Sequence, residues 1–214
     1  RENDISGLVI EGAFSSLSEN PMKPRNLPFL LATLVAAHSA HSSHLTWDIS
    51  PGTVGAGNGA STGGTGTWNT TNGNWTTNTG VNNVVWSNTS ADEAIFGGTT
   101  GTVTINTGTG VTANKLTFNT DGYIINGNVA ADVLTLAGTT PTLSAGSGIS
   151  ATINAIIAGS AGLTKDGAGT LALNGANTLT GTTELSAGTL VIGHVDAMSG
   201  ALTRTTGSGT ATIR

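Results

Sequence analysis

The sequence contains no cysteine and few charged or aromatic residues. Without cysteine among its 214 residues, the chain forms neither disulfides nor thiolate metal sites. Charged residues make up 9% of the chain and the net charge is −5, which argues against a basic surface for nucleic acid. Aromatic residues make up 4%, too few for the core of a bulky globular domain. A narrow repetitive fold, which needs only Leu, Ile and Val inside, is compatible with these absences.

The motifs of common catalytic and nucleotide-binding sites are also missing from the sequence. No serine has a histidine and aspartate in a triad pattern, and no glycine-rich phosphate loop opens a helix. Asp-rich calcium nonapeptides are absent as well. No segment has the pattern of a helix of ordinary length, because glycine and threonine are too frequent. The chain is therefore expected to be all-β.

The sequence does contain a repeat near its C-terminal end, and 32 glycines overall. When residues 168–181 are laid over residues 187–200, the tetrapeptide Ala-Gly-Thr-Leu and a later glycine coincide. In the same alignment Leu173 meets Ile192. A repeat of this length is one supersecondary unit, which buries its apolar face only by stacking on its neighbours.

Apolar pairs spaced by two positions extend this repeat in both directions. Residues two apart on a strand face the same side, so both members of a pair point inward. Similar steps along the chain connect Leu116, Leu134, Ile153, Leu171, Leu190 and Ala211. This spacing predicts a parallel β-helix, a solenoid with about three short strands per coil. The alternative is a disordered low-complexity chain. The residues expected inside include Leu134, Leu171, Leu173, Leu190 and Ile192.

Residues 162–193 carry a motif that resembles the autotransporter-associated β-strand repeat. The family pattern is close to K-x-GAGTL-x-L-x-GANT-x-TG, followed by a second AGTL. The chain departs from it by having one glycine, Gly181, where the family usually has two. The matching residues are Lys165, Gly167 to Leu171, Leu173, Gly175 to Thr178, Thr180, Gly181 and Ala187 to Leu190.

This resemblance implies the passenger region of a secreted bacterial surface protein. It implies a structural or adhesin-like role, with surface glycans or proteins of host or neighbouring cells as partners. A C-terminal outer-membrane β-barrel or another C-terminal anchor is expected in the full-length protein but not within this chain. Nucleic acid is not an expected partner.

Residues 22–42 have the features of a secretory signal peptide. The segment begins with Met-Lys-Pro-Arg and continues with an apolar run, Leu27–Ala37. Small residues follow, and cleavage is expected after Ser39 or Ser42. The run is too short to span a membrane, and the alternative is an ordinary buried helix. Residues 1–21 are then expected to be an upstream extension of the reading frame.

Three histidines spaced by three, at His38, His41 and His44, would suit a metal ion on a helix. They straddle the expected cleavage site, however, so no metal or cofactor site is predicted.

Residues 43–98 contain all four tryptophans of the chain. The segment ends in a block that resembles the one often found before autotransporter-associated repeats. Large rings suit a cap over the first coil of a solenoid, because open strand edges invite aggregation. The alternative is a sugar-stacking platform, in which Trp68 and Trp75 are candidate carbohydrate contacts beside several asparagines.

Asp166 and Glu184 are the one carboxylate pair that the repeat brings near a single coil, since their separation is close to one repeat. Polysaccharide lyases and hydrolases on β-helices need two or three carboxylates, or carboxylates with Arg and Lys, at one place. No second cluster accompanies this pair, and both residues are expected at solvated turns or edges. No catalytic residue is therefore predicted.

The sequence predicts a non-enzymatic, secreted or cell-surface passenger region. Residues 99–214 are expected to form the β-helix repeats, most clearly at 162–193, after the capping segment at 43–98. The alternatives are a carbohydrate-binding protein and a polysaccharide-degrading enzyme.

Overall fold

The computed structural model describes residues 44–49, 61–77, 83–198, 200–204 and 209–213. All of them belong to one compact unit, His38–Arg214. The expected signal peptide at 22–42 and the expected extension at 1–21 lie outside the described residues. Among the described residues, no helix is long and apolar enough to cross a membrane.

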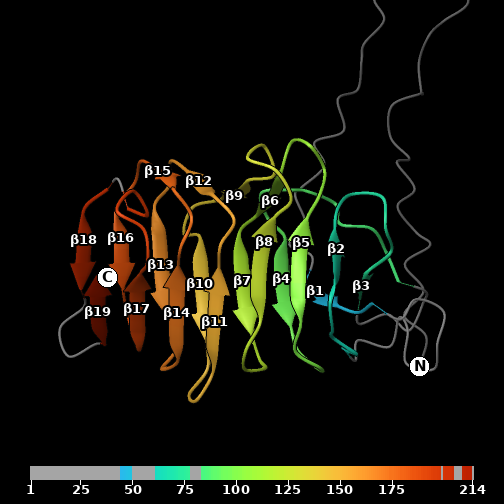
Figure 1. Cartoon of the computed structure of the whole chain (residues 1–214), viewed down its shortest axis with the longest axis horizontal. Coiled ribbons are helices and arrows are strands. Elements are labelled where there is room, and N and C mark those ends of the chain that lie inside the picture. Colours follow the sequence, from blue (N-terminus) through green and yellow to red (C-terminus); the bar gives the residue numbers. More distant parts are fainter. Residues whose placement is uncertain (1–43, 50–60, 78–82, 199, 205–208, 214) are drawn as a thin grey trace, which may run out of the picture. The chain divides into compact units, whose positions relative to one another are not determined.

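The strands of the described residues form three sheets, and these residues contain no helix (Figure 1). Sheet 1 contains, in spatial order, β18 (Leu202–Arg204), β16 (Thr183–Leu185), β13 (Leu163–Asp166), β10 (Thr142–Ala145), β7 (Lys115–Phe118), β4 (Glu93–Phe96), β1 (His44–Trp47) and β3 (Trp75–Thr76). Sheet 2 contains β19 (Thr210–Ile213), β17 (Thr189–Ile192), β14 (Thr170–Leu173), β11 (Ser150–Ile153), β8 (Ile124–Gly127), β5 (Thr102–Ile105) and β2 (Gly66–Trp68). Sheet 3 contains β15 (Thr178–Leu179), β12 (Ile157–Gly159), β9 (Leu134–Leu136) and β6 (Val111–Ala113).

The chain passes through the three sheets in a fixed order. From β4 it enters β5 and then β6, and the next coil repeats this order with β7, β8 and β9. From β4 onward, strands pair in parallel with the strand of the same sheet one coil later, as β4 does with β7 and β5 with β8. Figure 1 shows the strands of successive coils side by side. The predicted fold class, an all-β parallel β-helix, is confirmed.

Alternate side chains of each strand fill the inside of the solenoid. On sheet 2, Leu171 pairs with Leu190 and Leu173 with Ile192, so the apolar side chains form columns that run from coil to coil. Leu134 belongs to the corresponding column of sheet 3, where it pairs with Ile157. The inward positions predicted from the sequence are confirmed, because all of these leucines and Ile192 are at most 4% exposed.

The upstream part of the predicted ladder is wrong. Leu116 lies on sheet 1, Leu134 on sheet 3 and Ile153 on sheet 2, so these three residues do not stack on one another. Leu116 instead pairs with Leu143, which lies further along the chain than Leu134. The predicted step from Ile153 to Leu171 is also off by two positions, because Ile153 pairs with Leu173. The coils differ in length because the connections between their strands differ, as in the long connection at 128–133 between β8 and β9.

All four tryptophans are buried in one aromatic cluster at the N-terminal end of the solenoid. Ring centroids of neighbouring indoles lie 4.7–5.1 Å apart, several of them edge to face. Phe96 touches this cluster and stacks on Phe118 of the next coil, with centroids 5.2 Å apart. At the same end of sheet 1, β3 pairs antiparallel with β1. Large rings therefore fill the interior where the parallel stack begins, as a cap would.

Two kinds of residue from the repeat motif hold successive coils together. Gly167 and Gly188 have φ angles of +76° and +73°, and a Cβ at either would lie within 2.4 Å of a carbonyl oxygen of the preceding coil. Only glycine fits such a turn. Asn177 is buried, and its Oδ1 accepts a hydrogen bond from the Ile157 amide (2.7 Å) while its Nδ2 donates to the Ala197 carbonyl (2.8 Å). One asparagine thus joins three coils.

Lys165 faces the inside of the solenoid and is fully buried. It occupies a column of sheet 1 between Leu143 and Leu185. Burial lowers the pKa of its ammonium group, and the nearby charge of Asp166 offsets part of this shift. The Nζ atom donates hydrogen bonds of 2.7, 2.7 and 3.1 Å to the carbonyl oxygens of Asp166, Gly167 and Ala187.

Candidate functional site

Trp68 and Trp75, the candidate carbohydrate contacts, lie inside the aromatic cluster. Both side chains are 0% exposed, and their centroids are 5.0 Å apart. A sugar stacks on the open face of an aromatic ring, and neither ring has one. The interpretation of these residues as a sugar-stacking platform is therefore corrected: the rings pack against each other instead.

Asp166 and Glu184, the carboxylate pair considered for catalysis, lie on neighbouring strands of sheet 1 and are exposed. Glu184 pairs with Thr164, so Asp166 is offset from it by two positions along β13. Among the described residues, no group of three or more His, Cys, Asp and Glu side chains is close enough to hold a metal ion. The structure thus places both carboxylates on the outer face of sheet 1.

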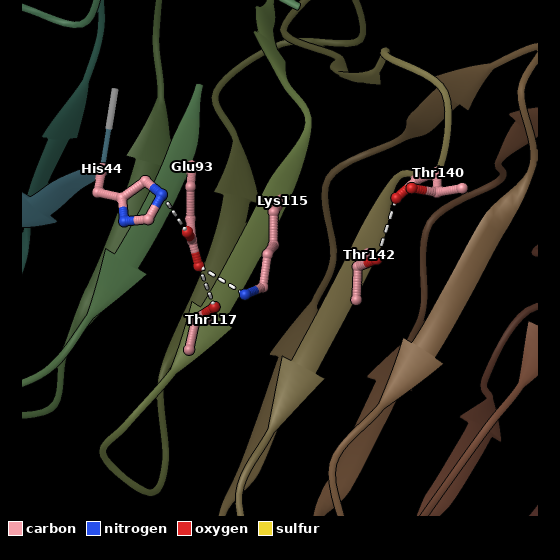
Figure 2. Close-up of polar contacts among 6 residues, drawn as sticks. All are labelled: His44, Glu93, Lys115, Thr117, Thr140 and Thr142. Atoms are coloured by element: carbon pink, nitrogen blue, oxygen red, sulfur yellow. Dashed lines mark hydrogen bonds and ion pairs between the residues drawn. The ribbon is translucent and has the colours of Figure 1, made fainter. Parts of the chain in front are cut away.

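The His44 imidazole lies against Glu93 on the outer face of sheet 1, whereas His38 and His41 lie outside the described residues. Its Nε2 lies 3.4 Å from Glu93 Oε2, and Lys115 Nζ lies 2.9 Å from Glu93 Oε1. The Thr117 hydroxyl donates a 2.7 Å hydrogen bond to the same Oε1 atom. Figure 2 shows these side chains reaching toward Glu93 from β1 and β7, the two strands next to β4.

Glu93 is the electrostatic centre of this cluster. Its side chain is only 10% exposed, and burial by itself would raise its pKa. Hydrogen bonds from Thr117 and Lys115, together with the charges of Lys115 and His44, outweigh burial and lower the pKa below the usual value. The carboxylate is therefore held in its charged form by three neighbours.

The same cross-strand positions continue over seven of the eight strands of sheet 1 as a row of polar side chains. The register of the parallel strands places one such residue on each of seven strands. We call this set the polar row, and its members are His44, Glu93, Lys115, Thr142, Thr164, Glu184 and Thr203. Adjacent members lie on strands about 4.8 Å apart. The row begins with charged groups and continues mainly with hydroxyl groups.

A hollow of about 210 Å³ lies over the later part of the polar row. It is lined by residues at or near the start of β10, β13 and β16, and by Thr203 of β18. Pro141 and Leu163 are its buried apolar members. We call it the threonine hollow, and its polar members are Thr139, Thr140, Thr164, Thr182, Glu184 and Thr203.

A second hollow, of about 260 Å³, lies beside the connection between β8 and β9. Its polar groups already serve the fold. Asp132 Oδ1 accepts hydrogen bonds from the amides of Thr107 and Gly108 (2.8 and 2.7 Å). Burial would raise the pKa of Asp132, but these backbone hydrogen bonds outweigh it and lower the pKa. Asn154 donates to Asn126 and accepts from Asn174, each at 2.9 Å.

Sequence reasoning missed the polar row because its members are separated by long and unequal stretches of chain. The alternation within single strands was visible in principle. Lys115 and Thr117 flank the inward Leu116, and Thr142 and Ser144 flank the inward Leu143. Aligning these strands requires the length of each connection, which the sequence pattern does not specify.

The comparisons with known proteins agree with the repeat and the solenoid. Residues 163–192 match the family model described as "Passenger-associated-transport-repeat". The chain is also 42% identical over 180 residues to a protein named "Adhesin BmaC autotransporter" from Brucella suis biovar 1 (strain 1330). This alignment covers 83% of the chain but only 5% of that protein's length. No solved structure matches the chain.

The family match coincides with the part of the solenoid in which coils are most regular, from β13 to β17. Its motif residues are the ones that close turns and join coils, as Gly167, Gly188 and Asn177 do. Together, the repeat, the β-helix and the similarity to an autotransporter indicate that this chain is a passenger segment of an exported, cell-surface protein.

Proposed function

We propose that this segment is a non-catalytic, adhesive part of a surface protein and that it contacts other molecules through the outer face of sheet 1. The polar row carries this proposal. It presents charged groups and then hydroxyl groups over seven strands of a sheet whose inner side is filled by the core. A parallel stack with a continuous core is stiff, so the outward groups keep fixed spacings.

The chemistry of the row supports binding rather than catalysis. Its carboxylates are separated: Glu93 is held by His44 and Lys115, and Glu184 lies four strands away on β16. Glycoside hydrolysis generally uses two such groups that flank one glycosidic bond. Among the residues that line the threonine hollow, Glu184 is the one carboxylate.

The similarity to an adhesin supports attachment to cells as the role of this surface. The aligned stretch is only 5% of that relative, so attachment by this segment is a separate question from attachment by a full-length protein. The test must therefore use the segment itself.

The experiment measures how many beads coated with the purified chain stay on cultured epithelial cells after washing. Thr142→Arg with Thr164→Arg changes two paired residues of the polar row. The matched control, Thr112→Arg with Thr135→Arg, changes two paired outward threonines of sheet 3. We expect the first variant to reduce bound beads at least about fivefold, which corresponds to about 1 kcal/mol, and the control to leave binding unchanged. Absence of binding by the parent chain, or equal loss in both variants, contradicts the proposal.

A further inference from the structure

We propose that Asn72 is a site of spontaneous modification, at which the side-chain carboxamide is converted to a carboxylate with water as the only reactant. Asn72 precedes Gly73 in the connection between β2 and β3, at the end of the stack that contains the aromatic cluster (Figure 1). The inference goes beyond the proposed function, because Asn72 is not a member of the polar row.

The reaction joins the backbone nitrogen of a glycine to the side chain of the asparagine before it. The Gly73 nitrogen loses its proton and attacks Cγ of Asn72, a bond forms between these two atoms, and Nδ2 leaves as ammonia. Water then opens the resulting succinimide ring at one of its two carbonyl groups. The products are aspartate and isoaspartate, in which the main chain runs through the side chain. Glycine favours this route because it has no Cβ beside the attacking nitrogen.

The sequence alone does not select the site, because it contains four pairs of asparagine followed by glycine. These pairs are Asn58-Gly59, Asn72-Gly73, Asn126-Gly127 and Asn174-Gly175. The first pair lies outside the described residues. The other three differ in what surrounds the two reacting groups, the carboxamide and the glycine nitrogen.

Both reacting groups are free at Asn72. Its side chain is exposed and, within the described part of the chain, neither its carboxamide nor the Gly73 amide makes a hydrogen bond. The main chain of the turn is held on either side of them. The Asn72 amide donates to Asn69 Oδ1 at 2.7 Å, and the Asn72 carbonyl accepts from the Asn74 amide at 2.9 Å. Rotation of the Asn72 side chain toward the Gly73 nitrogen therefore breaks no side-chain hydrogen bond.

The carboxamides of Asn126 and Asn174 are fixed in a ladder of side chains. Asn154 lies between them, donates from Nδ2 to Asn126 Oδ1 and accepts on Oδ1 from Asn174 Nδ2, each at 2.9 Å. Asn126 also belongs to β8, where it pairs with Thr104 of β5. Either carboxamide must leave its ladder partner before its Cγ can meet the glycine nitrogen, and the lost hydrogen bond slows the reaction.

The glycines of the three pairs differ in the same direction. A Cβ at Gly127 or Gly175 would lie within 2.7 Å of a backbone carbonyl oxygen, so neighbouring main chain covers both of them closely. At Gly73 the nearest atom to such a Cβ is the Asn83 carbonyl oxygen, at 3.3 Å. Gly73 does not have a positive φ angle either. The main chain at Gly73 therefore has more room to move, and alanine can replace this glycine.

Conversion of Asn72 changes both the charge and the main chain beside the aromatic cluster. Each converted chain gains one negative charge beyond its net charge of −5. Isoaspartate also lengthens the main chain directly before Asn74, whose carbonyl accepts the Asp48 amide and whose Nδ2 donates to the Thr67 carbonyl, each at 2.9 Å. The modification thus acts on the contacts that join this connection to β2 and to the end of β1.

The experiment incubates the purified full chain in mildly alkaline buffer and follows each pair by peptide mass spectrometry, with a separation that distinguishes aspartate from isoaspartate. We expect Asn72 to convert at least about tenfold faster than Asn126 and Asn174, which corresponds to about 1.4 kcal/mol of activation free energy. The chain unfolded in concentrated urea is the reference. The three pairs should convert there at similar rates, because the ladder and the packing of the glycines are lost.

Two variants block the reaction and leave the ladder intact. Gly73→Ala places a methyl group beside the attacking nitrogen, and Asn72→Gln lengthens the side chain so that a larger and less favourable ring would have to form. Each should slow the loss of ammonia at this position at least about tenfold. Asn126 and Asn174 of the same variants are the internal controls and should behave as in the parent. Far-UV spectra identical to that of the parent show that each variant is folded.

Conversion of Asn126 or Asn174 at the rate of Asn72 in the folded chain overturns the inference. So does a folded chain in which Asn72 stays unchanged while it converts in urea. Loss of ammonia from Gly73→Ala at the parent rate would mean that water attacks the carboxamide directly, and it would contradict the route through the Gly73 nitrogen.

Discussion

Lys165 shows how one residue can connect two coils from the inside. Its neighbours in the column, Leu143 and Leu185, contribute apolar packing only. Lys165 adds three hydrogen bonds to carbonyl oxygens, two in its own coil and one in the next. Its long methylene chain fills the column while the ammonium group reaches the turn. The burial of a charge opposes these gains, so the net contribution is much smaller than three separate bonds.

The variant Lys165→Met tests this balance. Methionine keeps most of the volume but leaves three carbonyl oxygens without their donor. We expect the free energy of unfolding to fall by about 1 to 3 kcal/mol, the cost of leaving buried acceptors unpaired. Urea denaturation measures it. Lys115→Met, which removes a partly exposed ion pair, should cost less than about 1 kcal/mol. Equal stability of Lys165→Met and the parent would mean that the hydrogen bonds only compensate the burial of the charge.

The stability difference between the parent and Lys165→Met should also depend on pH. The pKa of Lys165 in the folded chain lies below its ordinary value of 10.5. Between these two values the unfolded chain binds more protons than the folded chain, so the stability of the parent rises with pH. The methionine variant lacks this gain. Unfolding curves of both proteins, measured from neutral pH to pH 10.5, should therefore show the free energy of unfolding of the parent rising relative to that of the variant. A difference in free energy that stays constant over this range contradicts the lowered pKa of Lys165.

Glu93 should give a pH dependence at the acidic end. Its pKa in the folded chain lies below the ordinary 4.5, so its charged form contributes stability that is fully present above the unfolded value. That contribution is lost as the pH falls through the folded pKa. Glu93→Gln should therefore be less stable than the parent at pH 7 and nearly equal to it at pH 2. Thermal unfolding at both pH values measures this, with the exposed Glu184→Gln as the control. If Glu93→Gln is less stable than the parent by the same amount at both pH values, the lowered pKa of Glu93 is contradicted.

At the scale of elements, sequence periodicity predicted sheet 2 better than sheet 1. The stacking of Leu171 on Leu190 follows from a step of one repeat without insertions, and the structure confirms it. The predicted step from Leu116 to Leu134 is wrong because the chain leaves sheet 1 at β7 and crosses β8 and β9 before it returns at β10. A constant period cannot distinguish one sheet of a solenoid from the next when connections vary in length.

The inward position of Lys165 was missed for a related reason. A lysine between polar residues resembles an outward residue of a strand. Only its separation by two positions from the inward Leu163 indicates that Lys165 faces the interior. The outward row that forms the candidate site depends on the register of seven strands. That register follows from the strand pairing of the whole stack, which a local pattern does not contain.

A charge placed in a sheet 2 column should destabilise the stack, and the same charge at the next position should not. Leu171 is 1% exposed, whereas Ala172 on the same strand faces outward between Thr152 and Val191. Leu171→Asp puts an unpaired carboxylate into the apolar interior and should cost several kcal/mol. Ala172→Asp should change stability by less than about 0.5 kcal/mol. Similar melting temperatures for the two variants would mean that the inward assignment of β14 is wrong.

At the scale of the whole molecule, the two ends of the described stack are filled by different kinds of side chain. The N-terminal end has the aromatic cluster, in which large rings bury far more apolar area per residue than the leucines and alanines of later coils. The later coils contain mostly small and β-branched residues, with glycine at the turns. Each coil therefore contributes little by itself and depends on its neighbours.

This difference predicts that the C-terminal repeats do not fold alone. A fragment of residues 168–214 keeps β14 to β19 but loses β11 and β13, the strands against which β14 and β16 pair, together with the whole aromatic cluster. A repeat array needs about three stacked units for stability, and the many glycines of this fragment raise the entropy that ordering must overcome. We expect a far-UV spectrum without β structure and no cooperative melting transition. The fragment of residues 44–214, which keeps the cluster, should show both. A cooperative melt of the short fragment would mean that single repeats are independent folding units, because such a melt requires a core that does not depend on the preceding coils.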